Sequence, residues 1–258
     1  MCVPDVEEKM LELKNIGVVI KDGNEETEIL KDISLTVNDG ELVVLTGPNG
    51  GGKTTLAKVI MGLVSPASGS IYYNGNDITG LDITSRARAG VCYGFQQPPR
   101  FKGLTVRDLL TIATGGGVLP KGDACRYLTQ VGLCANDYLD REMDSSLSGG
   151  EIKRIEIATV LARAGAPGGI GLMIFDEPEA GIDLWSFSRL IETFGTLHAD
   201  HTASMIIISH QERIIRIADR VAVISGGRVS QIGSAEEVFP SIIADTVDSC
   251  PVIGRREH

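Results

Sequence analysis

A glycine-rich stretch between an apolar segment and a helix most restricts what this chain can fold into. Residues 47–54 read GPNGGGKT, which matches the pattern G-x-x-x-x-G-K-[ST]. Residues 41–46 before it have the composition of a buried strand, and residues 53–61 after it have helical spacing. Strand, loop and helix in this order are typical of an α/β fold that holds an anion at the positive end of the helix.

The residue types in this loop suit a triphosphate. Glycines let consecutive backbone N–H groups converge on phosphate oxygens. We expect Lys53 to reach the β- and γ-phosphates and the Thr54 hydroxyl to ligate Mg²⁺. A glycine turn that binds nothing is the alternative, and the agreement of pattern and context disfavours it. The predicted nucleotide-binding residues are Gly47, Pro48, Asn49, Gly50, Gly51, Gly52, Lys53, Thr54 and Thr55.

Two adjacent carboxylates follow a later apolar segment. Residues 172–175 read LMIF, and Asp176 and Glu177 come directly after them. Parallel sheets bind ligands at the carboxyl ends of their strands, so we predict Asp176 as a metal ligand and Glu177 as the group that orients the attacking water. Taken alone, the two acids fit a solvated turn equally well. The phosphate loop makes the metal site the favoured interpretation.

The run LSGGE at residues 147–151 precedes a segment with helical spacing. Ser148 with Glu151 three residues later is a capping box, so a capped helix alone would explain the run. Together with the phosphate loop, it resembles the signature of the ATP-binding cassette (ABC) ATPases. The resemblance implies that Ser148, Gly149 and Gly150 face the γ-phosphate of an ATP held by a second copy, in an ATP-dependent homodimer. A helix N-terminus suits that contact.

Three further residues stand in the order of that family's motifs. Gln96 resembles the glutamine-loop residue that contacts Mg²⁺ or its water, and His210 resembles the switch histidine at the γ-phosphate. Asp183 resembles the aspartate of the D-loop, which lies across the dimer interface. The resemblance therefore implies ATP and Mg²⁺ as cofactors. It implies Glu177, His210, Lys53 and Gln96 as catalytic residues, Thr54, Gln96 and Asp176 as metal ligands, and Ser148, Gly149, Gly150 and Asp183 as further nucleotide contacts.

The alternation of strand and helix predicts one α/β architecture, and the resemblance implies a single ABC ATPase domain over residues 1–258. We expect an α/β, P-loop NTPase core with a parallel sheet, an N-terminal antiparallel β layer and an inserted helical subdomain. The β layer is predicted from residues 10–20 and 29–37, with a polar turn at 21–28. The predicted core comprises residues 1–95 and 165–258, and the helical signature subdomain comprises 96–164. Residues 165–171 are interpreted as a surface loop.

Charge and hydropathy limit the partners. The net charge is −10, so the overall field repels phosphate backbones and anionic headgroups, and we expect no nucleic acid partner. No apolar run approaches the roughly 18 residues of a membrane-spanning helix. The acidic N-terminus lacks a secretory signal, so we expect a cytoplasmic protein with no direct membrane insertion. The five cysteines are scattered and give little support for a disulfide framework or a zinc site.

Two short runs separate roles within the family. Residues 176–183 read DEPEAGID, whereas transport ATPases commonly carry S-A-L-D at the end of this stretch. This form, with FQQPP at residues 95–99, is similar to the ATPase of the SUF iron-sulphur cluster assembly machinery. That likeness implies a SUF-type scaffold as partner. The alternative is the ATP-binding subunit of an ABC membrane transporter, docked on a permease. A chromosome-clamp ATPase is disfavoured, because residues 53–176 leave no room for coiled-coil arms.

One departure from the family concerns the nucleotide base. Family members usually stack an aromatic residue on adenine, yet this chain has no Phe, Trp or Tyr before Tyr72. Val18, Val19 or Ile20 would pack on the base instead, which predicts weaker and less base-selective binding.

Other residues are given structural interpretations. We expect His198 and His201 to be solvated in a polar turn and Trp185 and Phe187 to pack in the core. A basic rim near the glutamine loop is predicted from Arg86, Arg88, Arg100 and Lys102.

Overall fold

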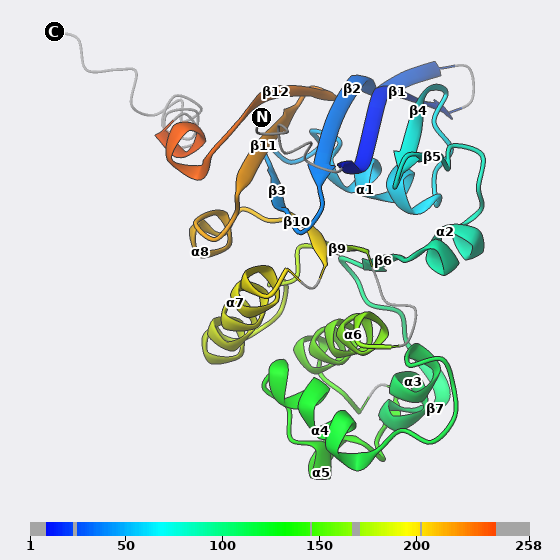
Figure 1. Cartoon of the computed structure of the whole chain (residues 1–258), viewed down its shortest axis with the longest axis vertical. Helices are drawn as coiled ribbons and strands as arrows, with labels where there is room; N and C mark the ends of the chain where they lie inside the picture. Colours follow the sequence, from blue (N-terminus) through cyan, green and yellow to red (C-terminus); the bar gives the residue numbers. More distant parts are fainter. Residues whose placement is uncertain (1–8, 23–24, 145, 167–170, 202, 241–258) are drawn as a thin grey trace, which may run out of the picture.

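The structure is a computed structural model that describes residues 9–22, 25–144, 146–166, 171–201 and 203–240. Within these residues the central sheet has six strands in the order β12-β11-β3-β10-β9-β6 (Figure 1). Apolar residues buried on both faces make up its middle strands, as in other parallel sheets. The strands are β3 Leu42–Thr46, β6 Val91–Gly94, β9 Leu172–Asp176, β10 Ser204–Ile208, β11 Arg220–Ser225 and β12 Arg228–Gly233.

The predicted parallel sheet is confirmed for five of these strands, with one addition at its edge. Neighbouring strands from β11 through β3, β10 and β9 to β6 are parallel, whereas β12 returns antiparallel to β11. The short segment between β11 and β12 explains the reversal, because a parallel connection needs a crossover of a dozen or more residues. The sheet is therefore mixed.

The predicted N-terminal antiparallel layer is confirmed as a second sheet, in the order β2-β1-β4-β5. The predicted polar turn over residues 21–28 is wrong, because β1 continues to Asp22 and β2 begins at Glu25. Its polar residues pair across the far end of a two-stranded ribbon, where neither face needs to be apolar. The strands are β1 Lys9–Asp22, β2 Glu25–Asn38, β4 Ser68–Tyr73 and β5 Asn76–Asp77.

Helices cover the central sheet on both faces. Helix α1, Lys53–Met61, packs in one hydrophobic cluster with the antiparallel sheet and one face of the central sheet. The other face packs against α6 and α7 in a second cluster. Helices α3 to α6 gather at the end of the molecule opposite β1 and β2 (Figure 1). The helices are α2 Ile83–Ala89, α3 Val106–Ala113, α4 Lys121–Gln130, α5 Ala135–Tyr138, α6 Gly149–Ala164, α7 Leu184–Ala199 and α8 Glu212–Ile215.

The predicted helical insertion also contains a short strand pair. Strands β7, Phe101–Thr105, and β8, Glu142–Met143, are antiparallel and lie beside α3. The subdomain boundaries at residues 96 and 164 stay a prediction. Residues 167–170 of the predicted surface loop lie outside the described part of the chain.

Candidate functional site

The phosphate loop connects β3 to the start of α1 and runs closely against β11. Gly47 has φ +122°, and a Cβ there would lie 2.3 Å from the carbonyl oxygen of Ile224. Both the backbone conformation and the space therefore require glycine at this position. Helix α1 begins at Lys53, so its N-terminal amides face the loop.

A pocket of about 500 Å³ lies at this loop. Gln96 and Glu177 reach it from β6 and β9, and Ile29 reaches it from β2. Ile29 was missed by the sequence reasoning, because no pattern shows which residue of the β ribbon borders the phosphate loop. Most of the predicted loop residues line the pocket as well: Asn49, Gly50, Gly51, Gly52, Lys53, Thr54 and Thr55.

The buried Lys53 ammonium binds two backbone carbonyls of its own loop. It donates to Gly47 O at 2.7 Å and to Pro48 O at 2.9 Å. Burial lowers the pKa of Lys53, and the charges of Glu177 and Asp176 oppose that shift. A cation paired only with neutral carbonyls is a strong attractor for an anion entering the pocket.

Oxygen donors that suit Mg²⁺ lie together at the end of β9. The fully buried Asp176 accepts a hydrogen bond from Thr54 Oγ1 at 3.2 Å and another from the hydroxyl of Tyr93 at 2.9 Å. Burial raises the pKa of Asp176, and these two hydrogen bonds oppose the rise. A carboxylate beside a hydroxyl fits a hard cation that prefers oxygen ligands. Tyr93 was not predicted, since its aromatic position in a strand resembles ordinary core.

Glu177 and His210 stand at the same edge of the sheet. Glu177 has φ +46°, an unusual conformation for a non-glycine residue, and its Oε2 accepts from Gln96 Nε2 at 2.7 Å. His210 Nδ1 lies 3.4 Å from Thr46 Oγ1. Burial, and then the charge of Lys53, lowers the pKa of His210, which favours the neutral imidazole.

Helix α6 carries an ion pair of low exposure, formed by Lys153 and Glu156. Lys153 Nζ donates to the carbonyl oxygens of Phe95 and Asp176 and lies 3.6 Å from Glu156 Oε2. Glu156 Oε1 accepts from the backbone N–H of Phe95 at 2.9 Å. Burial lowers the pKa of Lys153 and raises that of Glu156 to about 7.

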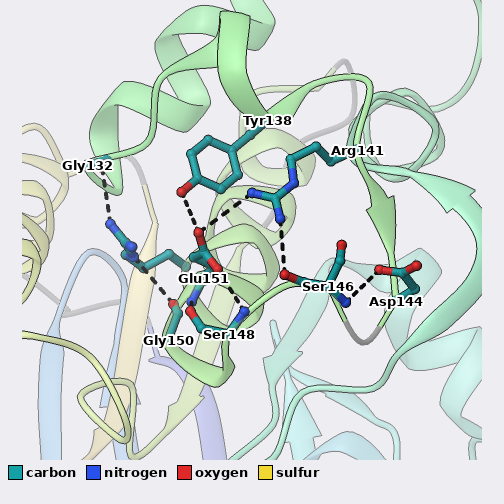
Figure 2. Close-up of polar contacts among 9 residues, drawn as sticks. Gly132, Tyr138, Arg141, Asp144, Ser146, Ser148, Gly150 and Glu151 are labelled. Carbon is teal, nitrogen blue, oxygen red and sulfur yellow. Dashed lines mark hydrogen bonds and ion pairs between the residues drawn. The ribbon is translucent and has the colours of Figure 1, made fainter.

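The signature turn begins α6 and is held by hydrogen bonds and an ion pair within the same chain (Figure 2). The predicted capping box is confirmed: Glu151 N donates to Ser148 Oγ at 3.3 Å, and Ser148 N donates to Glu151 Oε2 at 2.7 Å. Glu151 Oε1 accepts from Tyr138 OH at 2.5 Å and pairs with Arg141 at 3.7 Å. The hydrogen bonds from Tyr138 and Ser148 lower the pKa of Glu151 to about 2. Ser148 and Gly149 themselves are exposed.

The signature turn contacts the D-loop rather than the pocket. A Cβ on Gly150 would lie 2.4 Å from Gly181 O, and Arg154 joins Gly150 O to Ser186 Oγ. Asp183 caps α7 by accepting from two backbone N–H groups. In the described part of the chain, no hydrogen bond or ion pair joins Ser148, Gly149 or Gly150 to a residue lining the pocket. The structure therefore gathers the phosphate-loop, carboxylate and glutamine-loop residues and leaves the signature apart.

Two structural interpretations of apolar residues need correction. Val18 is buried in the core and cannot contact a base, whereas Val19 and Ile20 are exposed. Phe187 packs in the core as expected, but Trp185 is 85% exposed. Asp183 is the N-cap of α7, so Trp185 lies in the first turn of that helix, and the buried residues of the helix begin at Phe187.

Two interpretations of basic residues are also wrong. His198 is half-buried and its Nε2 lies 3.2 Å from Asp219 Oδ1, whereas His201 is exposed as expected. Both line a larger hollow of about 850 Å³ that contains none of the motif residues. Arg86 is 1% exposed, because it donates to carbonyls of Val59 and Ile60 at the end of α1. The other members of the predicted rim, Arg88, Arg100 and Lys102, are exposed.

The sequence pattern of the family described as ABC transporter matches residues 30–180. This chain belongs to that family. It is an ABC ATPase, an enzyme that hydrolyses ATP with Mg²⁺ as cofactor. An uncharacterized ABC transporter ATP-binding protein of Methanocaldococcus jannaschii is 38% identical over 218 residues, covering 82% of this chain and 85% of that protein.

Longer relatives and solved structures agree with this assignment. The sulfate/thiosulfate import ATP-binding protein of Pseudomonas putida is 33% identical, covering 85% of this chain and 66% of that longer protein. A dimeric ATP-binding cassette in a post-hydrolysis state with ADP and phosphate has TM-score 0.79 at 23% identity, covering 88% of this chain and 99% of that chain. A bacterial Atm1-family ABC exporter with ATP bound has TM-score 0.76 at 24% identity, covering 99% of this chain and 45% of that chain. These likenesses confirm the ABC ATPase fold.

In the described part of this ABC ATPase, no helix is both long and apolar enough to span a bilayer.

Proposed function

We propose that two copies of this ABC ATPase close head to tail on two ATP molecules and that closure moves a partner protein. Each ATP would lie between the phosphate loop of one copy and residues 148–150 of the other. The observation that carries this proposal is the position of the signature turn. The turn is exposed, it is bonded through Glu151 to Tyr138, and it makes no hydrogen bond to the described residues that line the chain's own pocket. A similar cassette is dimeric with ADP and phosphate bound, which is consistent with this arrangement.

The roles follow from the geometry. Lys53 would exchange its two carbonyl partners for phosphate oxygens, with the loop amides around it. Thr54, Asp176 and Gln96 would hold Mg²⁺, which neutralises charge on the β- and γ-oxygens when bound. Glu177, oriented by Gln96, would position the attacking water, and a neutral His210 would accept or donate a hydrogen bond at the γ-phosphate.

The relatives favour a membrane permease as the partner. Relatives with a named cargo include import ATP-binding proteins for sulfate/thiosulfate and for molybdate/tungstate. Phe101 and Ile112 are exposed apolar side chains on β7 and α3, in the segment after the glutamine loop. Exposed apolar groups on the helical end suit a protein contact. In this role the chain lies at the cytoplasmic side of the membrane.

A SUF-type scaffold is the second candidate partner. Gly181 in the run DEPEAGID has φ +73°, a left-handed conformation that an alanine at the same position would strain. The D-loop conformation therefore depends on the residue that distinguishes the SUF-like form from S-A-L-D. This chain would then drive a soluble assembly complex.

Purification of the chain at native abundance, with and without Glu177→Gln, tests both proposals. The variant should retain ATP and pair with a second copy, because hydrolysis is blocked while binding is intact. A co-purified permease supports the transporter role, and a β-rich scaffold with iron and sulphide supports the SUF role. A Glu177→Gln chain that stays a monomer with ATP bound would contradict the head-to-tail pair.

A further inference from the structure

The inner face of α6 carries two charged residues that no motif includes, one buried and one partly buried. Lys153 is 1% exposed and Glu156 lies beside it one turn further along the helix. We propose that Lys153 and Glu156 are positioning residues for the metal site, through which α6 sets the places of Gln96 and Asp176. The proposal does not depend on which partner the ATPase moves.

The strongest observation concerns the backbone of Phe95. Glu156 Oε1 accepts its N–H at 2.9 Å, and Lys153 donates to its carbonyl oxygen. Both backbone polar groups of Phe95 are therefore held by side chains of one helix. Gln96 is the next residue, so the start of the glutamine loop is held to α6.

The second observation joins the same lysine to the metal carboxylate. Lys153 Nζ also donates to the backbone carbonyl of Asp176 at 3.1 Å. One ammonium thus joins the backbone of Asp176, at the end of β9, to the backbone of Phe95, which follows β6 and directly precedes Gln96. Misplacing a reacting group by about 1 Å costs on the order of a hundredfold in rate, so a shared anchor has functional weight.

The energetics argue against a purely structural role. A buried ion pair gains little stability over well-packed apolar residues, because desolvation offsets the attraction. Glu156 Oε2 makes no hydrogen bond in the described structure, so the pair is not optimised for stability. What the pair achieves is placement of two backbone segments relative to α6.

Helix α6 also begins with the signature turn. Ser148 caps the helix, and Lys153 lies at its second turn. A tilt of α6 would therefore shift the signature turn and the glutamine loop together. The position of the signature turn and the binding of metal in the same chain would then depend on each other through α6.

The test compares Lys153→Met and Glu156→Gln with wild type in the full chain. In nucleotide-free protein, hydrogen exchange of the Phe95 amide should accelerate in both variants, since its anchors are weakened. The Mg²⁺ concentration for half-maximal ATP hydrolysis should rise about tenfold, as expected when a support for metal ligands is lost. ATP affinity measured in EDTA should stay near the wild-type value, because the phosphate loop is untouched.

Arg86→Met is the matched control. Arg86 is equally buried and also donates to backbone carbonyls, but it contacts neither Phe95 nor Asp176. This variant should lose stability and keep the wild-type Mg²⁺ requirement and Phe95 exchange. Lys153→Arg, which keeps a cation, should restore part of the metal affinity lost in Lys153→Met.

Two results would overturn the proposal. One is an unchanged Mg²⁺ requirement and unchanged Phe95 exchange in folded Glu156→Gln, which is the milder substitution. The other is an equal rise in the Mg²⁺ requirement in Arg86→Met, which would assign the effect to general loss of stability. If Lys153→Met does not fold, Glu156→Gln and Lys153→Arg decide the question by the same readouts.

Discussion

The two glycine stretches of this chain, at residues 47–52 and 149–150, lie in contrasting surroundings. The phosphate loop borders a pocket, its lysine is buried, and Asp176 and Glu177 stand beside it. The signature turn is exposed at Ser148 and Gly149, and Glu151 joins it to Tyr138 and Arg141 (Figure 2). Arg154 donates to the carbonyl oxygen of Gly150.

This difference supports the proposal that the catalytic site is divided between two copies. The phosphate loop lies beside the predicted metal ligand Asp176 of the same chain, whereas the proposal assigns Ser148 and two backbone amides to a ligand held by a second copy. Hydrogen bonds that fix the backbone of an exposed turn preorganise its N–H groups to bind an anion from another molecule. In the proposed pair, the phosphate that contacts the signature would therefore come with a second copy.

Removal of the cation at the phosphate loop has the largest expected effect. Lys53→Ala should lower both ATP affinity and turnover, with kcat/KM falling about a thousandfold, because a charge-assisted contact to phosphate is lost in binding and in the transition state. Equilibrium dialysis and steady-state kinetics measure the two effects. Binding that remains at the wild-type level would contradict the place of Lys53.

A change at the signature should separate binding from turnover. Ser148→Arg is expected to leave ATP affinity of the isolated chain unchanged and to lower turnover about a hundredfold, because it blocks only the second half of the site. Ser146→Arg is the matched control, since it adds the same side chain two residues earlier at an exposed position. Loss of ATP binding in Ser148→Arg monomers would remove the distinction between the two regions.

The base side of the phosphate pocket lacks an aromatic ring. Ile29 lines the pocket, and Val19 and Ile20 are exposed on the neighbouring strand β1, so we expect the base to meet aliphatic side chains. Ile20→Tyr should tighten ATP binding about tenfold by stacking on the base. Wild type should bind ATP and GTP within about threefold, since no polar contact to the base is built in. A strong wild-type preference for ATP would contradict this account.

The smallest effect is on the pH dependence of stability. Burial raises the pKa of Glu156 from 4.5 to about 7, so its stabilising contribution is present below pH 4.5 and is lost as the pH rises through about 7. The unfolding free energy of wild type relative to Glu156→Gln should therefore fall by on the order of 2 kcal/mol between about pH 5 and about pH 8.

Glu151 provides the opposite sign on the same helix. Hydrogen bonds lower its pKa from 4.5 to about 2, so its contribution is present above pH 4.5 and is lost as the pH falls toward about 2. Urea unfolding of wild type, Glu151→Gln and Glu156→Gln between about pH 2 and about pH 8 measures both pH-dependent contributions. Parallel profiles for the two variants would contradict the contrast between the exposed turn and the buried pair.

The sequence predicted the parts of the site that are contiguous along the chain. Helix α1 was predicted from Lys53 to Met61 and has these bounds, because Gly52 and Gly62 flank it in left-handed conformations. The capping box of Ser148 was likewise readable, since its two partners are three residues apart. Local spacing carries this information directly.

Contacts between distant segments could not be predicted. Helix α6 packs against α3 and α4 and also against β6, so Lys153 is buried and Glu156 is partly buried although their residue types indicate exposure. Tyr93 and Ile29 join the site through strand placement that no single-sequence pattern encodes. Trp185 was predicted to be buried and is exposed, because an aromatic residue type does not reveal which face of a helix it occupies.

The structure of Glu177→Gln crystallised with ATP and Mg²⁺ tests the divided site most directly. The account predicts two chains related head to tail, with each γ-phosphate contacted by Lys53 of one chain and by Ser148 of the other. A nucleotide contacted by residues of a single chain, with Ser148 facing solvent, would contradict it.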